Sequence, residues 1–210
     1  SGRAQTTWSG NIVLNNPHTI DVTDELVISA CTNVTMSSGV RIFVEGRITV
    51  EGTASCPVYF DFAGGGDHMG IQFNSSSNGR GSKIDNASII HSTYGITIYG
   101  SDPYLANVTI WNADDVAVDM FNQATPTIRN MVIDEAGQDW NFPTYWRYGI
   151  GFSVGAGSAP NVDGLSVNDA VTRGVNMWGN SGGLFRNVSI VNVTGSTLAE
   201  AAGIWVEDSV

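Results

Sequence analysis

Apolar and polar residues alternate along most of the chain, and the alternation comes in short runs that recur. The clearest run begins at an asparagine or glycine and places apolar residues at alternate positions after it; it begins at Asn86, Asn107, Asn130, Gly164 and Asn187. A second alternating run, such as Gly95-Ile96-Thr97-Ile98, follows each of these, and a third precedes it. Alternation with a period of two predicts a half-buried strand. The sequence therefore predicts three short strands in each repeat of about 22 residues.

The shared asparagine or glycine indicates a sharp corner between two strands. Such a corner needs a residue with positive φ, and these two residue types enter that region at the lowest cost. Apolar residues just past the corner, such as Ala87 and Ile89, are expected to point inward, so that successive repeats stack into a buried column. Like strands would then pair in parallel. The pattern predicts an all-β fold, a parallel β-helix solenoid with three strands per coil.

Motifs in the first half of the chain make this prediction more specific. Residues 44–53, 56–60 and 70–73 contain the patterns G-T-x-x-x-P-V-x-F and G-I-x-F. They resemble the opening coils of the right-handed parallel β-helix superfamily, which includes pectate lyases, polygalacturonases and many secreted surface proteins. The resemblance implies a right-handed solenoid. It identifies the fold well and the function poorly, because enzymes, adhesins and phage spikes share this scaffold.

Composition is consistent with one folded unit. The chain has 210 residues, of which 42% are hydrophobic and 14% charged, which fits a globular chain better than a disordered one. We expect a single domain over 1–210, with opening coils at 8–82 and regular coils at 83–210. Because the sequence ends just after an inward-facing strand, we expect this domain to be part of a longer chain with flanking domains.

Charge and cysteine content narrow the partners and the compartment. The net charge of −11 would repel a phosphate backbone, so nucleic acid is not expected as a partner. The sequence contains no apolar run of the roughly 18 residues needed to insert into a membrane. Cys31 and Cys56 suit one disulfide in an oxidising compartment, although two buried thiols would also fit. A secreted or cell-surface location is the resulting expectation.

Candidate binding residues lie on the outward side of the run that follows each corner. They are Tyr99, Asp119, Trp178, Trp205 and Glu207. An inserted segment beside them adds Trp140, Tyr145 and Trp146. Aromatic rings can stack on sugars, and carboxylates can accept hydrogen bonds from hydroxyl groups. The resemblance also places the substrate grooves of the enzymes on this face. The alternatives are a solvated face with incidental aromatics, and an inserted loop whose rings form a satellite core.

Catalytic and metal-binding candidates are weaker. Asp114 and Asp115 slightly resemble the acidic pair that precedes a strand in polygalacturonases, and they share one coil with Asp119. However, the chain lacks the accompanying Gly-His-Gly and Arg-x-Lys motifs. No cofactor is required by these patterns, and calcium is the one metal with plausible ligands, because carboxylates are oxygen donors. Its candidate ligands are Asp114, Asp115, Asp134, Asp139 and Asp169.

The sequence thus predicts a non-catalytic β-helix domain of a secreted or cell-surface protein that binds a polysaccharide, a glycan or another surface protein. Two alternatives remain open at this point. One is a polysaccharide-degrading enzyme, a glycoside hydrolase or a lyase, that uses the same face. The other is a structural spacer or filament unit.

Overall fold

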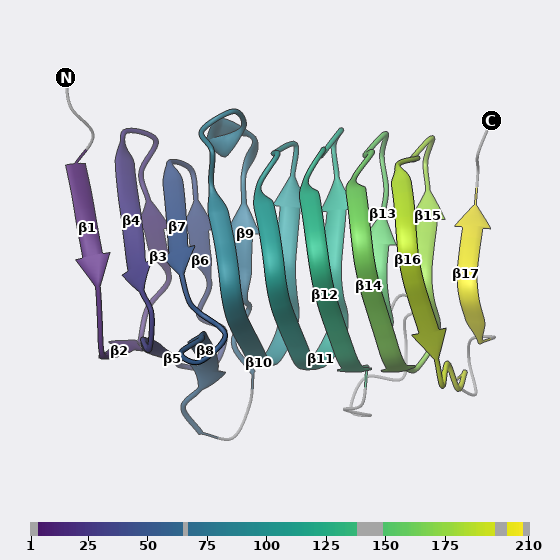
Figure 1. The fold of residues 1–210 in the computed structure, drawn as a ribbon, viewed down its shortest axis with the longest axis horizontal. Helices are drawn as coiled ribbons and strands as arrows, with labels where there is room; N and C mark the ends of the chain where they lie inside the picture. The colour runs from purple at the N-terminus through teal and green to yellow at the C-terminus, as the bar shows by residue number, and fades with distance from the viewer. Residues whose placement is uncertain (1–3, 65–66, 138–148, 196–200, 208–210) are drawn as a thin grey trace.

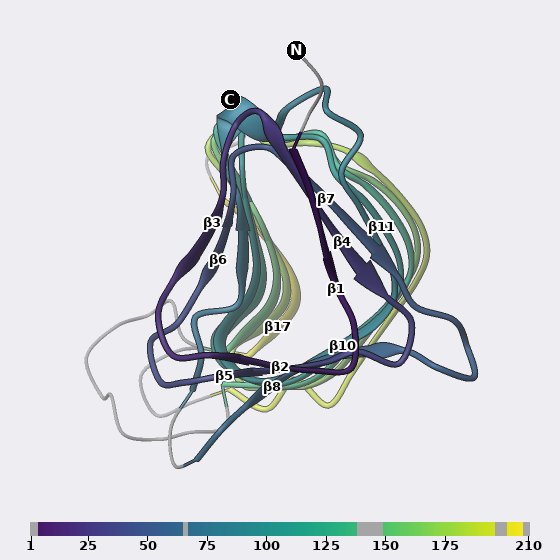
Figure 2. The ribbon, with the colours of Figure 1, turned by 90° about the vertical axis from the view of Figure 1, so that its left-hand side faces the viewer.

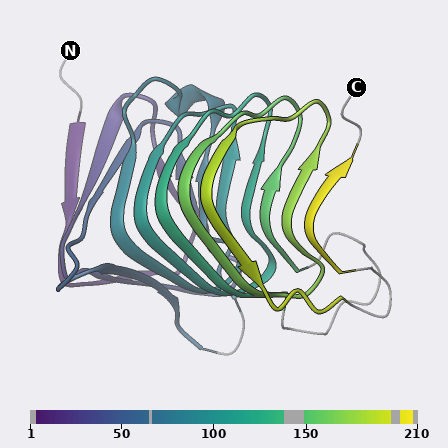
Figure 3. The same cartoon turned by 45° about the vertical axis from the view of Figure 1, so that its right-hand side comes forward.

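The computed structural model of the protein describes residues 4–64, 67–137, 149–195 and 201–207. Over these residues the strands form one 17-stranded sheet, in which the paired strands run parallel. The sheet is wound into coils that stack side by side along one axis (Figures 1 and 3). Each coil contributes one strand, or part of a strand, to each of three rows. The predicted all-β parallel solenoid is confirmed.

The three rows contain all the strands. The first row consists of β1 (Ala4–Trp8), β4 (Asp24–Ser29), β7 (Arg47–Glu51) and the starts of β10 (Lys83–Tyr99), β11 (Tyr104–Phe121), β12 (Thr127–Ala136), β14 (Asn161–Ala170) and β16 (Leu184–Val191). The second row consists of β2 (Asn11–Leu14), β5 (Asn33–Met36), β8 (Val58–Phe62) and the later parts of the same five long strands. The third row consists of β3 (His18–Ile20), β6 (Ile42–Val44), β9 (Ile71–Phe73), the ends of β10 and β11, β13 (Ile150–Val154), β15 (Arg173–Trp178) and β17 (Ala202–Glu207). One 3₁₀ turn, η1 (Ser75–Ser77), follows β9.

The corner between the first and second rows is built by the repeated asparagine or glycine. The φ values are 49° at Asn86, 52° at Asn107, 49° at Asn130, 81° at Gly164 and 52° at Asn187. Side chains of neighbouring coils are linked here: Asn130 Nδ2 donates to Asn107 Oδ1 at 3.2 Å, and Asn107 Nδ2 donates to Asp85 Oδ1 at 3.0 Å. Asn187 donates to Asp163 Oδ1 at 2.7 Å, since Gly164 has no side chain to offer. Sequence analysis expected these corners to separate strands, yet β10 and β11 run through them, because a single positive-φ residue bends the ladder without ending it.

A second corner, between the second and third rows, also uses one positive-φ residue in each later coil. These residues are His91, Asn112, Glu135, Asp169 and Asn192, with φ between 54° and 56°. The register of the strands places them next to one another. Sequence analysis missed this ladder because its members share no residue type. It accounts for Asp169, one of the candidate calcium ligands, as a corner residue.

The interior is filled by the inward-facing side chains of all three rows. Phe60, Phe73 and Phe152 are fully buried, as are most of the isoleucines of the later coils. Burying each such side chain contributes about 1.5–3 kcal/mol. His68, between β8 and β9, is the fully buried histidine of this core.

The third row bows toward the interior in the later coils, whereas β3 and β6 run straighter (Figure 2). Glycines at the start of the bowed strands permit this close approach. A Cβ on Gly151 would lie 2.5 Å from Val167 Cγ1, and a Cβ on Gly174 would lie 2.4 Å from Ile190 Cγ2. Both distances are below what a real Cβ tolerates, so glycine at this position lets the third row approach the side chains of the second. The leading glycine of Gly95-Ile96-Thr97-Ile98 has the same steric cause, since a Cβ on Gly95 would lie 2.8 Å from Ile110 Cγ2.

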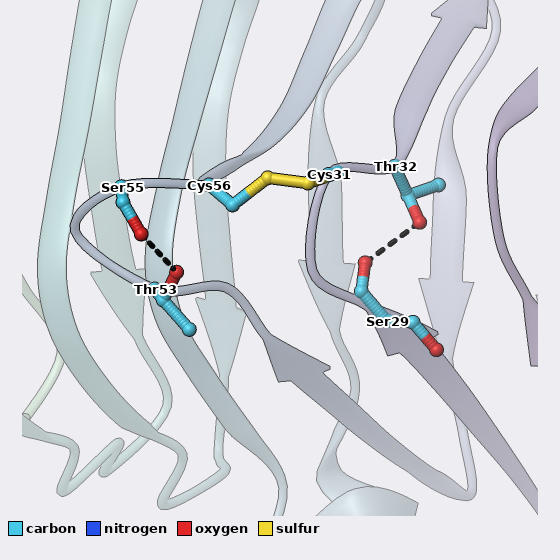
Figure 4. Close-up of a disulfide and its surroundings, with 6 residues drawn as sticks. All are labelled: Ser29, Cys31, Thr32, Thr53, Ser55 and Cys56. Atoms are coloured by element: carbon cyan, nitrogen blue, oxygen red, sulfur yellow. Dashed lines mark hydrogen bonds between the residues drawn. A yellow bond between two sulfur atoms is a disulfide. The ribbon is translucent and has the colours of Figure 1, made fainter.

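The predicted disulfide between Cys31 and Cys56 is present (Figure 4). It joins the corner between β4 and β5 to the loop between β7 and β8, and so links two neighbouring coils. The described residues include no helix that is both long and apolar enough to span a membrane.

Candidate binding face

The outward residues of the third row form two columns that cross the strands, which we call the bowed face. Register places the first column in the order Gln72, Thr97, Asp119, Ser153, Asn176 and Trp205. The second column, two residues further along each strand, contains Asn74, Tyr99, Phe121, Gly155, Trp178 and Glu207. All five outward candidates from the sequence lie in these columns: Asp119 and Trp205 in the first, and Tyr99, Trp178 and Glu207 in the second.

Aromatic rings follow one another along the second column. Tyr99 has 39% of its surface exposed and meets Phe121 edge to face, with ring centroids 5.1 Å apart. Trp178 leans back over β13: a Cβ on Gly155 would lie only 2.0 Å from Trp178 Cε2. The indole of Trp178 therefore occupies the space above Gly155. The rings of three strands, β10, β11 and β15, are brought onto one face.

Three residues of the first column, Thr97, Ser153 and Asn176, are buried although they lie on the outward side of their strands. Ser153 and Asn176 are each only 4% exposed. Large neighbours lie against them: Trp178 Nε1 donates to Ser153 Oγ at 3.4 Å, and Arg173 Nη1 donates to Asn176 Oδ1 at 3.0 Å. Ser153 is covered by an indole from the next coil and Asn176 by an arginine of its own strand, so an outward position does not by itself make a side chain accessible.

Arg173 connects the polar part of the face to its last aromatic ring. The guanidinium carbon lies 4.8 Å from the centroid of Trp205, a cation–π geometry. Trp205 keeps 37% of its surface exposed. Arg173 therefore contacts both Asn176 and the indole of Trp205.

A second arginine lies at the opposite end of the face. Arg41 Nε donates to the carbonyl of Met69 at 2.9 Å, and its Nη1 donates to Gln72 Oε1 at 2.5 Å. Its guanidinium carbon also lies 5.5 Å from the ring centroid of Tyr94. Burial lowers the pKa of Arg41 from its ordinary value, but a guanidinium stays charged at neutral pH. Arg41 is thus a fixed positive charge with its donors directed at the protein.

The acidic residues of the coil formed by β11 meet at Tyr94. Burial, the hydrogen bond to Asp115 and the negative charges of Asp115 and Asp119 together raise the pKa of the Tyr94 hydroxyl well above its usual range. Asp115 is 7% exposed, while Asp119 is partly exposed in the first column. Asp115 and Asp119 therefore lie close to the same tyrosine, and Tyr94 stays protonated as a hydrogen-bond donor at neutral pH.

A hydrogen-bond network lies at the edge of the bowed face nearest the N-terminal coils. Gln72 Nε2 donates to Asn74 Oδ1 at 2.7 Å, and Asn74 Nδ2 and the Ser76 hydroxyl both donate to the carboxylate of Glu45. Glu45 therefore accepts two hydrogen bonds from this corner. The network fixes the orientation of the Gln72 amide at the edge of the bowed face.

The candidate calcium ligands are dispersed in the described part of the chain. Asp134 lies in the second row, Asp169 is at the second corner one coil later, and Asp114 and Asp115 lie between that corner and the third row. Among the described residues no group of three or more His, Cys, Asp or Glu could hold a metal ion. Asp139 lies outside the described residues, so the calcium site stays a prediction.

Three other candidates, Trp140, Tyr145 and Trp146, also lie outside the described residues. Sequence reasoning missed four polar members of the site: Arg41, Gln72, Tyr94 and Asn74. Gln72 and Asn74 were accessible to it, because extending the outward alternation of G-I-x-F to β9 selects both residues. Arg41 and Tyr94 carry no such signal, since they precede the alternating run.

Comparisons with known proteins identify the scaffold alone. Residues 12–195 match the family model described as a right handed beta helix region. No curated protein and no solved structure matches the chain significantly. The match covers most of the chain, including every strand of the bowed face except β17.

Proposed function

The chain belongs to the right-handed β-helix family, and from this premise we propose that it is a non-catalytic domain that binds a saccharide on the bowed face. The family supplies a rigid solenoid that hosts many activities. The function therefore has to be argued from the side chains of this face.

The observation that carries the proposal is the combination of accessible aromatic rings with oriented polar groups on one surface. Tyr99 and Trp205 each leave more than a third of their surface exposed. Gln72 and Asp119 lie on the strands either side of Tyr99 and are partly exposed, and their side chains can donate to or accept from hydroxyl groups. Sugar rings present apolar faces and hydroxyl edges, so a surface with both kinds of group suits them.

The polar groups of the face favour binding over chemistry. Each of the two arginines is held by hydrogen bonds to the protein and by an aromatic ring. Asp115 is buried against Tyr94. A fixed arrangement of this kind is preorganised to hold a ligand, and preorganisation lowers the entropic cost of binding.

The location we propose is secreted or cell-surface. A disulfide links two of the opening coils, and disulfides persist in oxidising compartments. A glycan of a surface or matrix would be encountered there. Flanking domains of a longer polypeptide, or another surface protein, are further partners in this proposal.

Retention on polysaccharides tests the proposal. The purified chain is run through affinity gels that contain soluble polysaccharides, beside the variants Tyr99→Ala and Trp205→Ala. We expect retarded migration of the wild type in at least one gel, and loss of retardation in both variants with unchanged melting temperatures. Tyr104→Ala and Trp111→Ala are matched controls, because these exposed aromatics lie on the first and second rows.

Failure has a clear form in this assay. Retardation that survives both variants would place the binding elsewhere, and no retardation in any gel would favour the spacer or filament alternative. Unfolding of Tyr99→Ala and Trp205→Ala would mean that these rings serve the core instead.

A second candidate function, glycoside hydrolysis, is favoured by one observation. Asp115 and Asp119 both lie close to Tyr94, and glycosidases use a pair of carboxyl groups. An assay for new reducing ends with each polysaccharide that is retained tests this function. Activity that is lost in Asp119→Asn while retention persists would establish it over simple binding.

A further inference from the structure

We propose that the bowed face takes an uncharged sugar chain that runs along the solenoid axis, across the strands, and that Gly155 is a positioning residue that seats Trp178 in the stacking column. This inference rests on the proposed function and deepens it.

The direction of the ligand follows from the origin of the rings. Tyr99, Phe121 and Trp178 come from different strands and are linked by register through Gly155. Adjacent strands are about 4.8 Å apart, a spacing close to the length of one pyranose unit. A chain that crosses the strands can therefore place successive sugar rings over successive side chains, whereas a chain along one strand would meet a single ring.

Gly155 makes the column continuous. Its coil contributes no aromatic residue to the second column, and its neighbour Phe121 lies one strand before it. The indole of Trp178 fills that position from the next coil: an added Cβ would meet Cε2 at 2.0 Å, Cζ2 at 2.3 Å and Nε1 at 2.5 Å. The hydrogen bond from Trp178 Nε1 to Ser153 Oγ fixes the rotation of the ring. Any larger residue at 155 would have to move the indole.

The charges of the face select against acidic sugars. The described columns contain the carboxylates of Asp119 and Glu207, and the carboxylate of Glu45 lies at their edge. Arg41 and Arg173 direct hydrogen bonds to Gln72, Met69 and Asn176, and the whole chain carries a net charge of −11. A polyuronate brings one negative charge per sugar into this field and is repelled. A neutral chain meets no such repulsion.

Isothermal titration in the presence of EDTA tests both parts on the full chain. The probes are neutral β-1,4-linked gluco-, manno- and xylo-oligosaccharides and an oligogalacturonate of the same length. We expect binding of at least one neutral probe, with weaker binding of the oligogalacturonate. Gly155→Ala and Trp178→Ala should each weaken binding of the neutral probe about tenfold, because the first displaces the aromatic anchor and the second removes it. Gly182→Ala is the matched control, because a Cβ there would meet nothing within 4 Å.

A double-mutant cycle separates positioning from general damage. If Gly155 acts through Trp178, Gly155→Ala should cost nothing further once Trp178 is alanine. Ser153→Ala gives an independent variant, since it removes the hydrogen bond of the indole without adding bulk.

The outcomes separate a failure of the proposed function from a failure of this inference. No binding of any saccharide overturns the proposed function together with this inference. Wild-type binding that is equal or tighter for oligogalacturonate overturns the uncharged ligand. If Gly155→Ala and Ser153→Ala both keep wild-type affinity, or if the effects in the cycle are additive, Gly155 does not position Trp178. The proposed function stands in either case.

Discussion

Acidification should destabilise this protein through one buried histidine, His68. Its ring is fully buried; Nδ1 accepts the N–H of Gly70 at 2.9 Å, and Nε2 lies 3.1 Å from the carbonyl of Ile90. These contacts require the neutral tautomer with its proton on Nε2. A second proton on Nδ1 would face the donor of Gly70 and would place a charge in the core. Burial accordingly lowers the pKa of His68 to about 4, although Asp61 and Asp67 act in the opposite direction.

The direction of the pH effect follows from that pKa. Between the ordinary value of 6.5 and the folded value of about 4, the unfolded chain binds this proton and the folded chain does not. Stability from His68 is therefore complete above pH 6.5 and is lost as the pH falls toward 4. At 1.36 kcal/mol for each pKa unit, the loss in the free energy of unfolding is about 3 kcal/mol.

Urea unfolding of the wild type and of His68→Gln at a series of pH values measures this contribution of His68 to the free energy of unfolding. Glutamine can keep the donor to Ile90 but cannot take up the proton, so the wild type should lose about 3 kcal/mol more than the variant over this range. Carboxylates that titrate in the same range affect both proteins alike and cancel in the comparison. Parallel pH profiles, or an NMR titration that gives His68 an ordinary pKa, would refute the reasoning.

Three further predictions concern stability, each measured by chemical unfolding. Reduction of the disulfide between Cys31 and Cys56, which are 25 residues apart, should cost about 3.5 kcal/mol through the entropy of the unfolded chain; an unchanged midpoint after verified reduction would contradict it. Asn130→Leu should cost about 1–3 kcal/mol, because leucine is strained at positive φ and the hydrogen bond to Asn107 is lost, while Asn130→Gly should cost less; equal costs would remove the backbone argument. Gly174→Ala should cost about 1–3 kcal/mol by overpacking against Ile190, and a neutral result would show that the third row can move outward.

The sequence was sufficient to predict the architecture because a solenoid shows the same residue pattern in every coil. The same corner residue and the same alternation occur in coil after coil, so an error in one coil is corrected by the others. The inward and outward directions of the third row followed from this alternation. Accessibility did not follow, because burial of Ser153 depends on Trp178 of the next coil and burial of Asn176 on Arg173 of its own strand, and neither residue leaves a periodic signal.

The second corner shows a similar limit. Positive φ there is adopted by His91, Asn112, Glu135, Asp169 and Asn192, and no shared residue type marks the position. Asparagine accounts for two of the five; in the others the stacked neighbours impose a conformation that the side chain alone would disfavour. The preference of a residue type for positive φ predicts a corner only where the tertiary structure favours the same conformation.

Parallel register between neighbouring coils gives the protein a modular unit of variation. Lys83, Tyr104 and Thr127 of three successive coils are paired in register. A tandem duplication of one coil would therefore insert a strand into every row without shifting any other pairing. Each coil contacts its neighbours, so the energetic effects of such a duplication stay local. The bowed face would lengthen by about 4.8 Å with each added coil. Gain and loss of whole coils therefore offers evolution, and protein engineering, a direct way to match the length of the surface to the length of a ligand.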